Sequence, residues 1–260
     1  MTVTYETRAG TGGTGTGIVR MDAGRADIAQ LRRLVRAGSR ALNEQFDDDA
    51  HLDRIIPKPW GHEYRAYVDD FFDLWSLHID TPHSTSIHVH PRKLTYLLCL
   101  GGQGATTGLD REDIRIAAGS VLRIARGTFH GTRNMGDDPL ELIEVEVPRN
   151  KFDLMRLQDD YNRAGTAYES QSVEHPRNTM RAVPSLPNAR MRKTSPDRRF
   201  RFELRTGMDI FYRRRPEDIF HIPLCVSGVV NSDVEILTGN PADTRRPLMD
   251  RTYLSISRNH

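Results

Sequence analysis

Short runs of apolar residues, many with a polar residue at every second position, fill the chain between residues 63 and 147. A repeat of two is the period of a β-strand whose two faces have different surroundings. Clusters of Gly, Pro and Asp separate the runs and are typical of turns. The predicted strands cover residues 63–68, 72–79, 84–90, 95–100, 104–108, 113–116, 120–124, 130–133 and 140–147. So many short strands at close spacing predict an all-β sandwich or barrel.

A helical pattern precedes these strands. The apolar residues that recur at near-helical spacing are Ile28, Leu31, Val35 and Leu42. An aspartate, Asp22 or Asp27, can cap the start of the helix. Three aspartates at 47–49 would be unfavourable at its C-terminal end, so the helix should stop before them. We expect one amphipathic covering helix and a linker over residues 22–56.

Residues 1–21 form a tail that is rich in Gly and Thr. Residues 10–15 satisfy the letters G-x-G-x-x-G, but a dinucleotide site needs a βαβ unit and an acidic residue about 20 positions later. A single helix and then strands follow here. We therefore expect a flexible tail and no nucleotide loop.

Three histidines are the strongest candidates for chemistry. His88 and His90 are two residues apart on one predicted strand, so their side chains point to the same face. His130 follows a glycine turn at the end of another apolar run. Three neutral imidazoles from two strands are a suitable ligand set for zinc, iron, manganese or nickel. We expect a divalent metal cofactor at these residues.

The spacing around these histidines resembles the two motifs of the cupin family. The positions that match are His88, His90 and Gly102 in the first motif and Gly119, Gly127, His130 and Asn134 in the second. The positions that depart are Pro82 and Ala125, and Thr95 stands where the family has a glutamate. The resemblance implies a jelly-roll barrel, with a cupin domain over residues 57–170. Without the glutamate, either three histidines hold the ion together with water or substrate, or metal binding is weak or absent.

Within that span the sequence also resembles the cupin domain of type II mannose-6-phosphate isomerases and their relatives near sugar-nucleotide genes. The residues that carry this likeness are 58–61, 140–146, Asp153, Leu157, Asp160 and Tyr161. The resemblance implies a phosphorylated or nucleotide-linked sugar as the substrate. Many cupins form dimers, which leads us to expect a homodimer.

Other side chains could work beside the metal. Glu144 and Glu146 share one face of the strand 140–147, and two carboxylates so close repel each other, which can raise the pKa of one of them. A carboxyl group of raised pKa suits a general acid or base. Lys93 follows the histidine pair and could act as an acid or contact an anion. For substrate binding we place Arg123, Thr95 and Asn134 at the site.

Beyond the cupin segment, residues 171–260 form a basic region that is again rich in predicted strands. Residues 190–215 carry ten cationic and three anionic side chains. These arginines could bind phosphate or form a basic surface. The predicted strands cover residues 201–204, 209–212, 219–226, 234–237 and 253–257. The region is either a degenerate second jelly roll or a β-rich extension.

Composition narrows the class of protein further. The 260 residues are 37% hydrophobic and carry a net charge of +2, so the whole chain gives no case for nucleic-acid binding. No apolar run approaches the length that spans a bilayer, and the two cysteines are too few for a disulfide framework. We expect a cytoplasmic protein that binds neither membrane nor nucleic acid.

The leading hypothesis is a metal-dependent isomerase or epimerase of a phosphorylated or nucleotide-linked sugar. Three histidines without a carboxylate also suit a ferrous-iron dioxygenase, which is the first alternative. A non-catalytic sugar-binding cupin is the second, because the glutamate is missing.

Overall fold

The computed structural model describes residues 17–39, 51–69, 71–149, 153–158, 173–174, 179–181, 191–224, 229–230 and 233–259. The helices are α1 (Arg25–Arg36) and α2 (Gly207–Tyr212). The strands up to residue 124 are β1 (Val19–Met21), β2 (Arg54–Lys58), β3 (Gly61–Val68), β4 (Asp73–Ile79), β5 (Ile87–Val89), β6 (Leu94–Gly101), β7 (Gln103–Gly108), β8 (Ile114–Ala117) and β9 (Val121–Ile124). The later strands are β10 (His130–Asn134), β11 (Leu140–Val147), β12 (Met155–Gln158), β13 (Val173–Glu174), β14 (Met180–Arg181), β15 (Arg192–Thr194), β16 (Phe200–Thr206), β17 (Asp218–Pro223), β18 (Val229–Val230), β19 (Asp233–Val234), β20 (Leu237–Thr238) and β21 (Thr252–Arg258).

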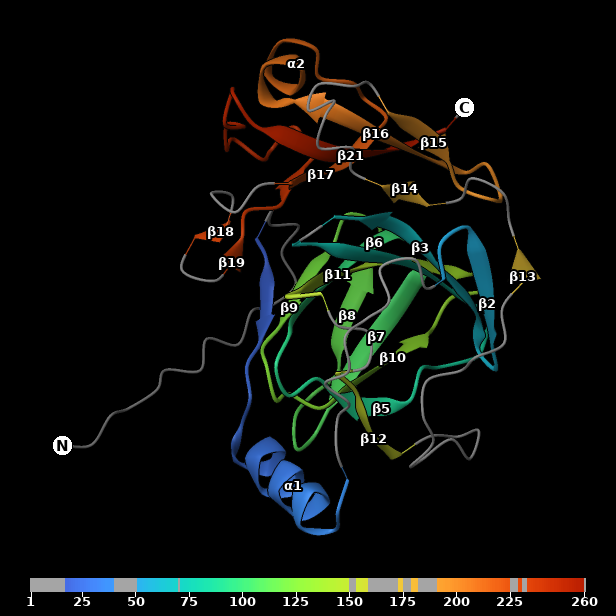
Figure 1. The fold of residues 1–260 in the computed structure, drawn as a ribbon, viewed down its shortest axis with the longest axis vertical. Coiled ribbons are helices and arrows are strands. Elements are labelled where there is room, and N and C mark those ends of the chain that lie inside the picture. The colour runs from blue at the N-terminus through green and yellow to red at the C-terminus, as the bar shows by residue number, and fades with distance from the viewer. Residues whose placement is uncertain are drawn as a thin grey trace, which may run out of the picture.

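Two sheets enclose the barrel at the centre of the molecule (Figure 1). The larger sheet runs β1-β9-β6-β11-β4-β3-β2-β13, with β14 also paired to β3, and the smaller runs β12-β5-β10-β7-β8. A cluster of buried apolar side chains, among them Trp60, Trp75 and Leu142, fills part of the interior. This arrangement confirms the predicted all-β jelly-roll fold.

Strand β11 shows how the period of two builds the barrel. Ile143 and Val145 point outward into the core beneath the C-terminal region. Leu142, Glu144 and Glu146 point inward and line a cavity. Neighbouring β4 and β6 pair with β11 on both sides, so its backbone hydrogen bonds are satisfied and both of its faces are buried.

Five strands of the C-terminal region form one antiparallel sheet, in the order β15-β16-β21-β17-β20, which covers the outer face of the barrel's larger sheet (Figure 1). The apolar core between this sheet and the larger sheet of the barrel includes Tyr96 from β6, Phe220 from β17 and Ile256 from β21. Within the residues that the structure describes, this is a β-rich extension of five strands and not a second barrel.

The predicted strand at 209–212 is wrong, because these residues belong to α2. The hydroxyl of Thr206 accepts a hydrogen bond from the main-chain N–H of Asp209, which caps the first turn of a helix. The basic segment around it is extensively paired: Arg205 contacts both Asp209 and Asp218 at 2.7 Å. Pairing of this kind supports the interpretation of the segment as a structural, basic part of the surface.

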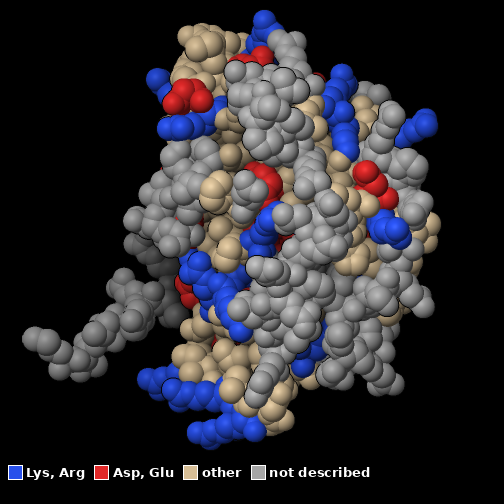
Figure 2. Space-filling model, in the orientation of Figure 1, with Lys and Arg blue, Asp and Glu red and all other residues tan. Residues whose placement is uncertain are grey.

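Helix α1 packs on the barrel in an orientation different from the predicted one. Leu31 and Leu34 contact the apolar cluster at the lower end of the barrel, whereas Ile28 and Val35 are 47% and 59% exposed. The reason is Asp27, which is fully buried and accepts hydrogen bonds from the N–H groups of Gly24 and Phe129. The outward side carries arginines, which Figure 2 shows as a cationic group at the end of the molecule where α1 lies.

Neither helix in the described ranges has the length and apolar character that crossing a lipid bilayer requires.

A fully buried ion pair joins β3 to β4. Arg65 Nε donates to Asp73 Oδ1 at 2.8 Å and its Nη2 donates to Oδ2 at 3.3 Å, and both side chains have no exposed surface. Removal of one partner would leave a buried charge without its counter-ion, which is strongly destabilising.

We therefore expect Asp73→Ala to lower the free energy of unfolding by about 3–5 kcal/mol. Chemical denaturation of the purified variant measures this loss. The matched control is Asp113→Ala, because Asp113 forms a surface pair with Arg133 at 3.3 Å that should contribute no more than about 1 kcal/mol. Equal losses in the two variants would contradict the prediction.

A second buried polar group lies in the C-terminal sheet. His221 of β17 is 4% exposed, and its Nδ1 lies 2.8 Å from Ser255 Oγ. Burial, followed by the positive charges of Arg205, Arg214 and Arg215, lowers the pKa of His221 from 6.5 to about 3. The folded protein keeps this imidazole neutral at pH values where the unfolded chain binds a proton.

Stability contributed by His221 is therefore complete above pH 6.5 and is lost as the pH falls toward 3. We expect His221→Asn to reduce the loss of unfolding free energy between pH 7 and pH 5 by about 2 kcal/mol. Denaturant titrations of both proteins at the two pH values measure this difference. Identical losses in wild type and variant would refute the assignment.

Candidate metal centre

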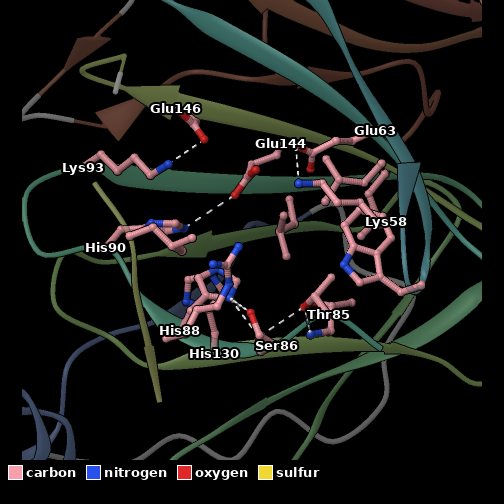
Figure 3. Close-up of a pocket in the computed structure, with 17 residues that line it drawn as sticks. Lys58, Glu63, Thr85, Ser86, His88, His90, Lys93, His130, Glu144 and Glu146 are labelled. Atoms are coloured by element: carbon pink, nitrogen blue, oxygen red, sulfur yellow. Dashed lines mark hydrogen bonds and ion pairs between the residues drawn. The ribbon is translucent and has the colours of Figure 1, made fainter. Parts of the chain in front are cut away.

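The three predicted histidines converge inside the barrel (Figure 3). His88 lies in β5, His90 directly follows it, and His130 begins β10. Strands β5 and β10 are paired, with His130 opposite His88. One ring nitrogen from each histidine lies within 4.8 Å of the other two, and the ring centroids are 4.4–5.2 Å apart.

The backbone orients all three imidazoles in the same way. His88 Nδ1 lies 2.8 Å from the carbonyl oxygen of Ser86, and His130 Nδ1 lies 3.0 Å from that of Thr128. His90 Nδ1 lies 2.7 Å from the carbonyl oxygen of Asp153. A carbonyl only accepts hydrogen bonds, so each Nδ1 carries the proton and each Nε2 keeps its lone pair. Three lone pairs are left for a common ligand.

The electrostatic environment keeps these rings neutral. Burial lowers the pKa of His88 and His130, and it lowers the pKa of His90 to about 3. The Nε2 atom of His90 is buried and makes no hydrogen bond to any described residue. Neutral imidazoles held by second hydrogen bonds are the form that binds metal ions. The donor set therefore fits a divalent metal ion, the predicted cofactor.

The histidines line a small cavity of about 70 Å³. Part of the wall is apolar, with Trp60 and leucine side chains. The charged residues of the wall are Lys58, Glu63, Lys93, Glu144, Glu146 and Arg156. A cavity of this size holds a few water molecules or one end of a small molecule.

The charged side chains of the wall are arranged in pairs. Lys93 Nζ donates to Glu146 Oε1 at 2.5 Å, and both side chains are almost completely buried. Glu144 Oε1 lies 3.7 Å from His90 Nε2. The expected repulsion between Glu144 and Glu146 is thus offset, because Lys93 contributes a positive charge to the same face.

The structure does not bring the three predicted substrate-binding residues to the cavity, whose lining among the described residues consists of other side chains. Arg123 points outward and pairs with Asp22 and Asp233. Asn134 is buried, and its amide donates to Ile79 O, Thr81 Oγ1 and Asp138 O, which ties loops together.

Thr95 is buried opposite Glu146 on the inward face of β6. Its hydroxyl makes no hydrogen bond to any part of the chain that the structure describes. A role in substrate binding stays a prediction for Thr95, as it does for Arg123 and Asn134.

Asp153 is a residue that the sequence analysis did not assign to the site. It is fully buried, and its carboxylate accepts hydrogen bonds from the main-chain N–H groups of Arg92 at 2.7 Å and Lys93 at 3.0 Å. Its own carbonyl oxygen accepts from His90. One residue thus holds a candidate ligand and the loop that positions Lys93. Because Asp153 is 63 positions from His90, no local spacing could have revealed it.

We expect Asp153→Ala to weaken divalent-metal binding by about 10- to 100-fold, because the loop after His90 loses the acceptor that holds it. Competition with a chromophoric chelator measures this affinity. Arg92→Ala is the control, since it removes only the guanidinium contact at 3.3 Å and keeps both main-chain donors. Wild-type metal affinity in Asp153→Ala would show that Asp153 does not support the site.

Residues 76–146 match a family model described as the cupin domain. A comparison with curated proteins gave no match.

Three solved structures are similar over part of the chain. Oxalate decarboxylase of Lactobacillus farciminis in its formate complex is 18% identical, with a TM-score of 0.36 over 40% of this chain and 33% of that chain. A conserved double-stranded β-helix protein of Klebsiella pneumoniae is 18% identical, with a TM-score of 0.36 over 45% of this chain and 100% of that one. The cupin domain of Schizosaccharomyces pombe Cnp3 is 12% identical, with a TM-score of 0.32 over 34% and 64%. The chain spans about a third of the length of the oxalate decarboxylase that it matches.

The match to the family model covers β5, which holds His88, and β10, which holds His130. It also covers β6. Residues 76–146 therefore match the cupin domain, and the three histidines within that match form a cluster that could hold a metal ion.

Proposed function

We propose that this protein is a metal-dependent cupin enzyme that moves a proton on a phosphorylated or nucleotide-linked sugar, as an isomerase or epimerase. The observation that carries the proposal is the content of one cavity. Three neutral imidazoles share it with two carboxylates, Glu144 and Glu146, and with the ammonium group of Lys93. A Lewis-acid centre and groups that exchange protons are thereby within reach of the same small molecule.

The reaction begins when a base takes the proton from the carbon next to a carbonyl group. The electron pair of the broken C–H bond moves to the carbonyl oxygen. In an isomerase the hydroxyl group on that carbon passes its proton to the former carbonyl oxygen and becomes the new carbonyl, while the abstracted proton is added to the former carbonyl carbon. In an epimerase the proton returns to the opposite face of the carbon that lost it, and the original carbonyl re-forms. A divalent ion held by the histidines would stabilise the negative charge on that oxygen. Positioned proton transfer contributes typically about 10²–10⁴-fold in rate.

The chain supplies the proton carriers from the inward face of β11 and from the residue that precedes β6. Glu146 and Lys93 are in direct contact at 2.5 Å, so a proton can pass between them. Both groups are almost fully buried, which excludes water that would compete for the proton.

The cavity admits only the reacting end of a sugar, so a phosphate or nucleotide group would lie at its mouth. Lys58 and Arg156 line the cavity and are the cations that we propose for that group, in place of the predicted Arg123. Lys58 already contacts Glu63 at 3.3 Å, and an arginine is suited to bidentate binding of phosphate.

One observation favours a second candidate, the ferrous-iron dioxygenase. Leu77, Leu97 and Leu142 form an apolar wall beside the histidines. Such a lining suits a site that must keep water away from iron and oxygen. The non-catalytic sugar-binding cupin is the third candidate. The predicted homodimer and cytoplasmic location stay predictions.

The test combines elemental analysis with solvent-exchange NMR. Protein loaded in turn with Mn²⁺, Zn²⁺ and Fe²⁺ is incubated in D₂O with hexose phosphates and nucleotide-linked sugars. We expect deuterium to enter at the carbon next to the carbonyl group, and Glu146→Gln to slow this exchange by about 10²–10⁴-fold. The exposed Asp137→Ala is the control and should exchange at the wild-type rate.

The alternatives give different results in the same experiment. Oxygen uptake by the iron form without deuterium exchange supports the dioxygenase and refutes the isomerase. Sugar binding in a thermal-shift assay, with neither exchange nor oxygen uptake for any metal, supports the binding protein.

A further inference from the structure

A divalent ion at three neutral imidazoles would bring two positive charges into a buried site. An uncompensated buried charge is unfavourable, because the protein interior solvates it poorly. A carboxylate close to the imidazoles would offset part of this charge. Three carboxylates line the cavity within the described ranges: Glu63, Glu144 and Glu146.

Contacts on the two sides of the cavity separate these three. Glu63 contacts Lys58 at 3.3 Å and Glu146 contacts Lys93 at 2.5 Å. Glu144 Oε1 lies 3.7 Å from the Nε2 of His90, which is one of the candidate ligand atoms. In Figure 3 its carboxylate points toward His90, whereas that of Glu146 points toward Lys93.

We propose that Glu144 is the fourth ligand of the metal ion, supplied from β11 in place of the carboxylate that Thr95 lacks. Two ligand atoms on one ion at about 2.0–2.2 Å lie about 3–3.5 Å from each other. The observed 3.7 Å between Glu144 Oε1 and His90 Nε2 is close to this range, and the carboxylate would have to turn toward His88 and His130 to join the same ion.

The position of Glu144 on its strand supports this role. It is opposite Leu97 of β6 and Trp75 of β4, so both neighbouring strands hold the segment that carries it. Its side chain is 8% exposed. Thr95, the position where the family has a glutamate, is buried opposite Glu146 and carries only a hydroxyl.

This assignment rests on the metal centre of the proposed function and gives the residues of the cavity separate roles. Glu144 then holds the ion, and Glu146 with Lys93 remains as the pair that moves the proton. A dication bound by one carboxylate and three neutral imidazoles keeps a charge of +1, which favours an anionic oxygen of a substrate over a neutral one.

The experiment titrates metal-free protein with Co²⁺ by calorimetry and records the visible absorption of the bound ion, with circular dichroism to verify folding. We expect Glu144→Gln to weaken binding by about 10- to 100-fold and to change the Co²⁺ spectrum. Glu63→Gln is the matched control, because it removes the same charge from the same cavity. It should bind within about threefold of wild type and keep the wild-type spectrum.

The possible results distinguish a wrong assignment of Glu144 from the absence of a metal centre. If the two variants lose affinity equally and both keep the wild-type spectrum, Glu144 acts only through its charge and the assignment is overturned. If wild-type protein binds no Co²⁺, or if His88→Ala binds it as wild type does, the metal centre of the proposed function itself fails.

A crystal structure of cobalt-loaded wild-type protein answers the question without a variant, should Glu144→Gln not fold. A Glu144 oxygen at about 2.0–2.2 Å from the ion supports the assignment. A separation beyond about 3 Å overturns it.

Discussion

The pairing of β5 with β10 is the constraint on which the rest of the site depends. It sets His130 opposite His88, and the alternation of side chains along β5 brings His90 to the same side. Carbonyl oxygens of Ser86, Thr128 and Asp153 then hold every Nδ1. Because these acceptors belong to the backbone, the direction of each lone pair follows from the fold itself.

The described part of the barrel encloses several charged side chains that are paired with one another. Lys93 faces Glu146, Lys58 faces Glu63, and Arg65 faces Asp73. A buried charge without such a partner would be strongly destabilising. Glu144 lies on the same face of β11 as Glu146, and its carboxylate points toward His90 (Figure 3).

Segments outside the two sheets hold the loops that carry the site. Asp27 of α1 accepts a hydrogen bond from Phe129, next to His130, and Asp153 holds the loop after His90. On the far side of the larger sheet, the C-terminal sheet buries the outer face of β6 and β11. The hydroxyl of Tyr96 donates to Asp233 Oδ1 at 3.5 Å and accepts a hydrogen bond from the N–H of Val234 at 2.8 Å. The covering elements thus hold the loops that carry the site and also bury the outer face of the larger sheet.

The sequence by itself determined the all-β class, the shared face of His88 and His90, and the shared face of Glu144 and Glu146. These features depend on periods of two along single strands, which any reader of the chain can follow. Only the tertiary structure decided that Arg123 pairs with Asp233 outside the barrel, that Asp153 supports His90, and that α2 replaces a predicted strand. Such contacts join residues far apart in the chain, or depend on a cap that competes with strand pairing, and the spacing of residues carries no record of them.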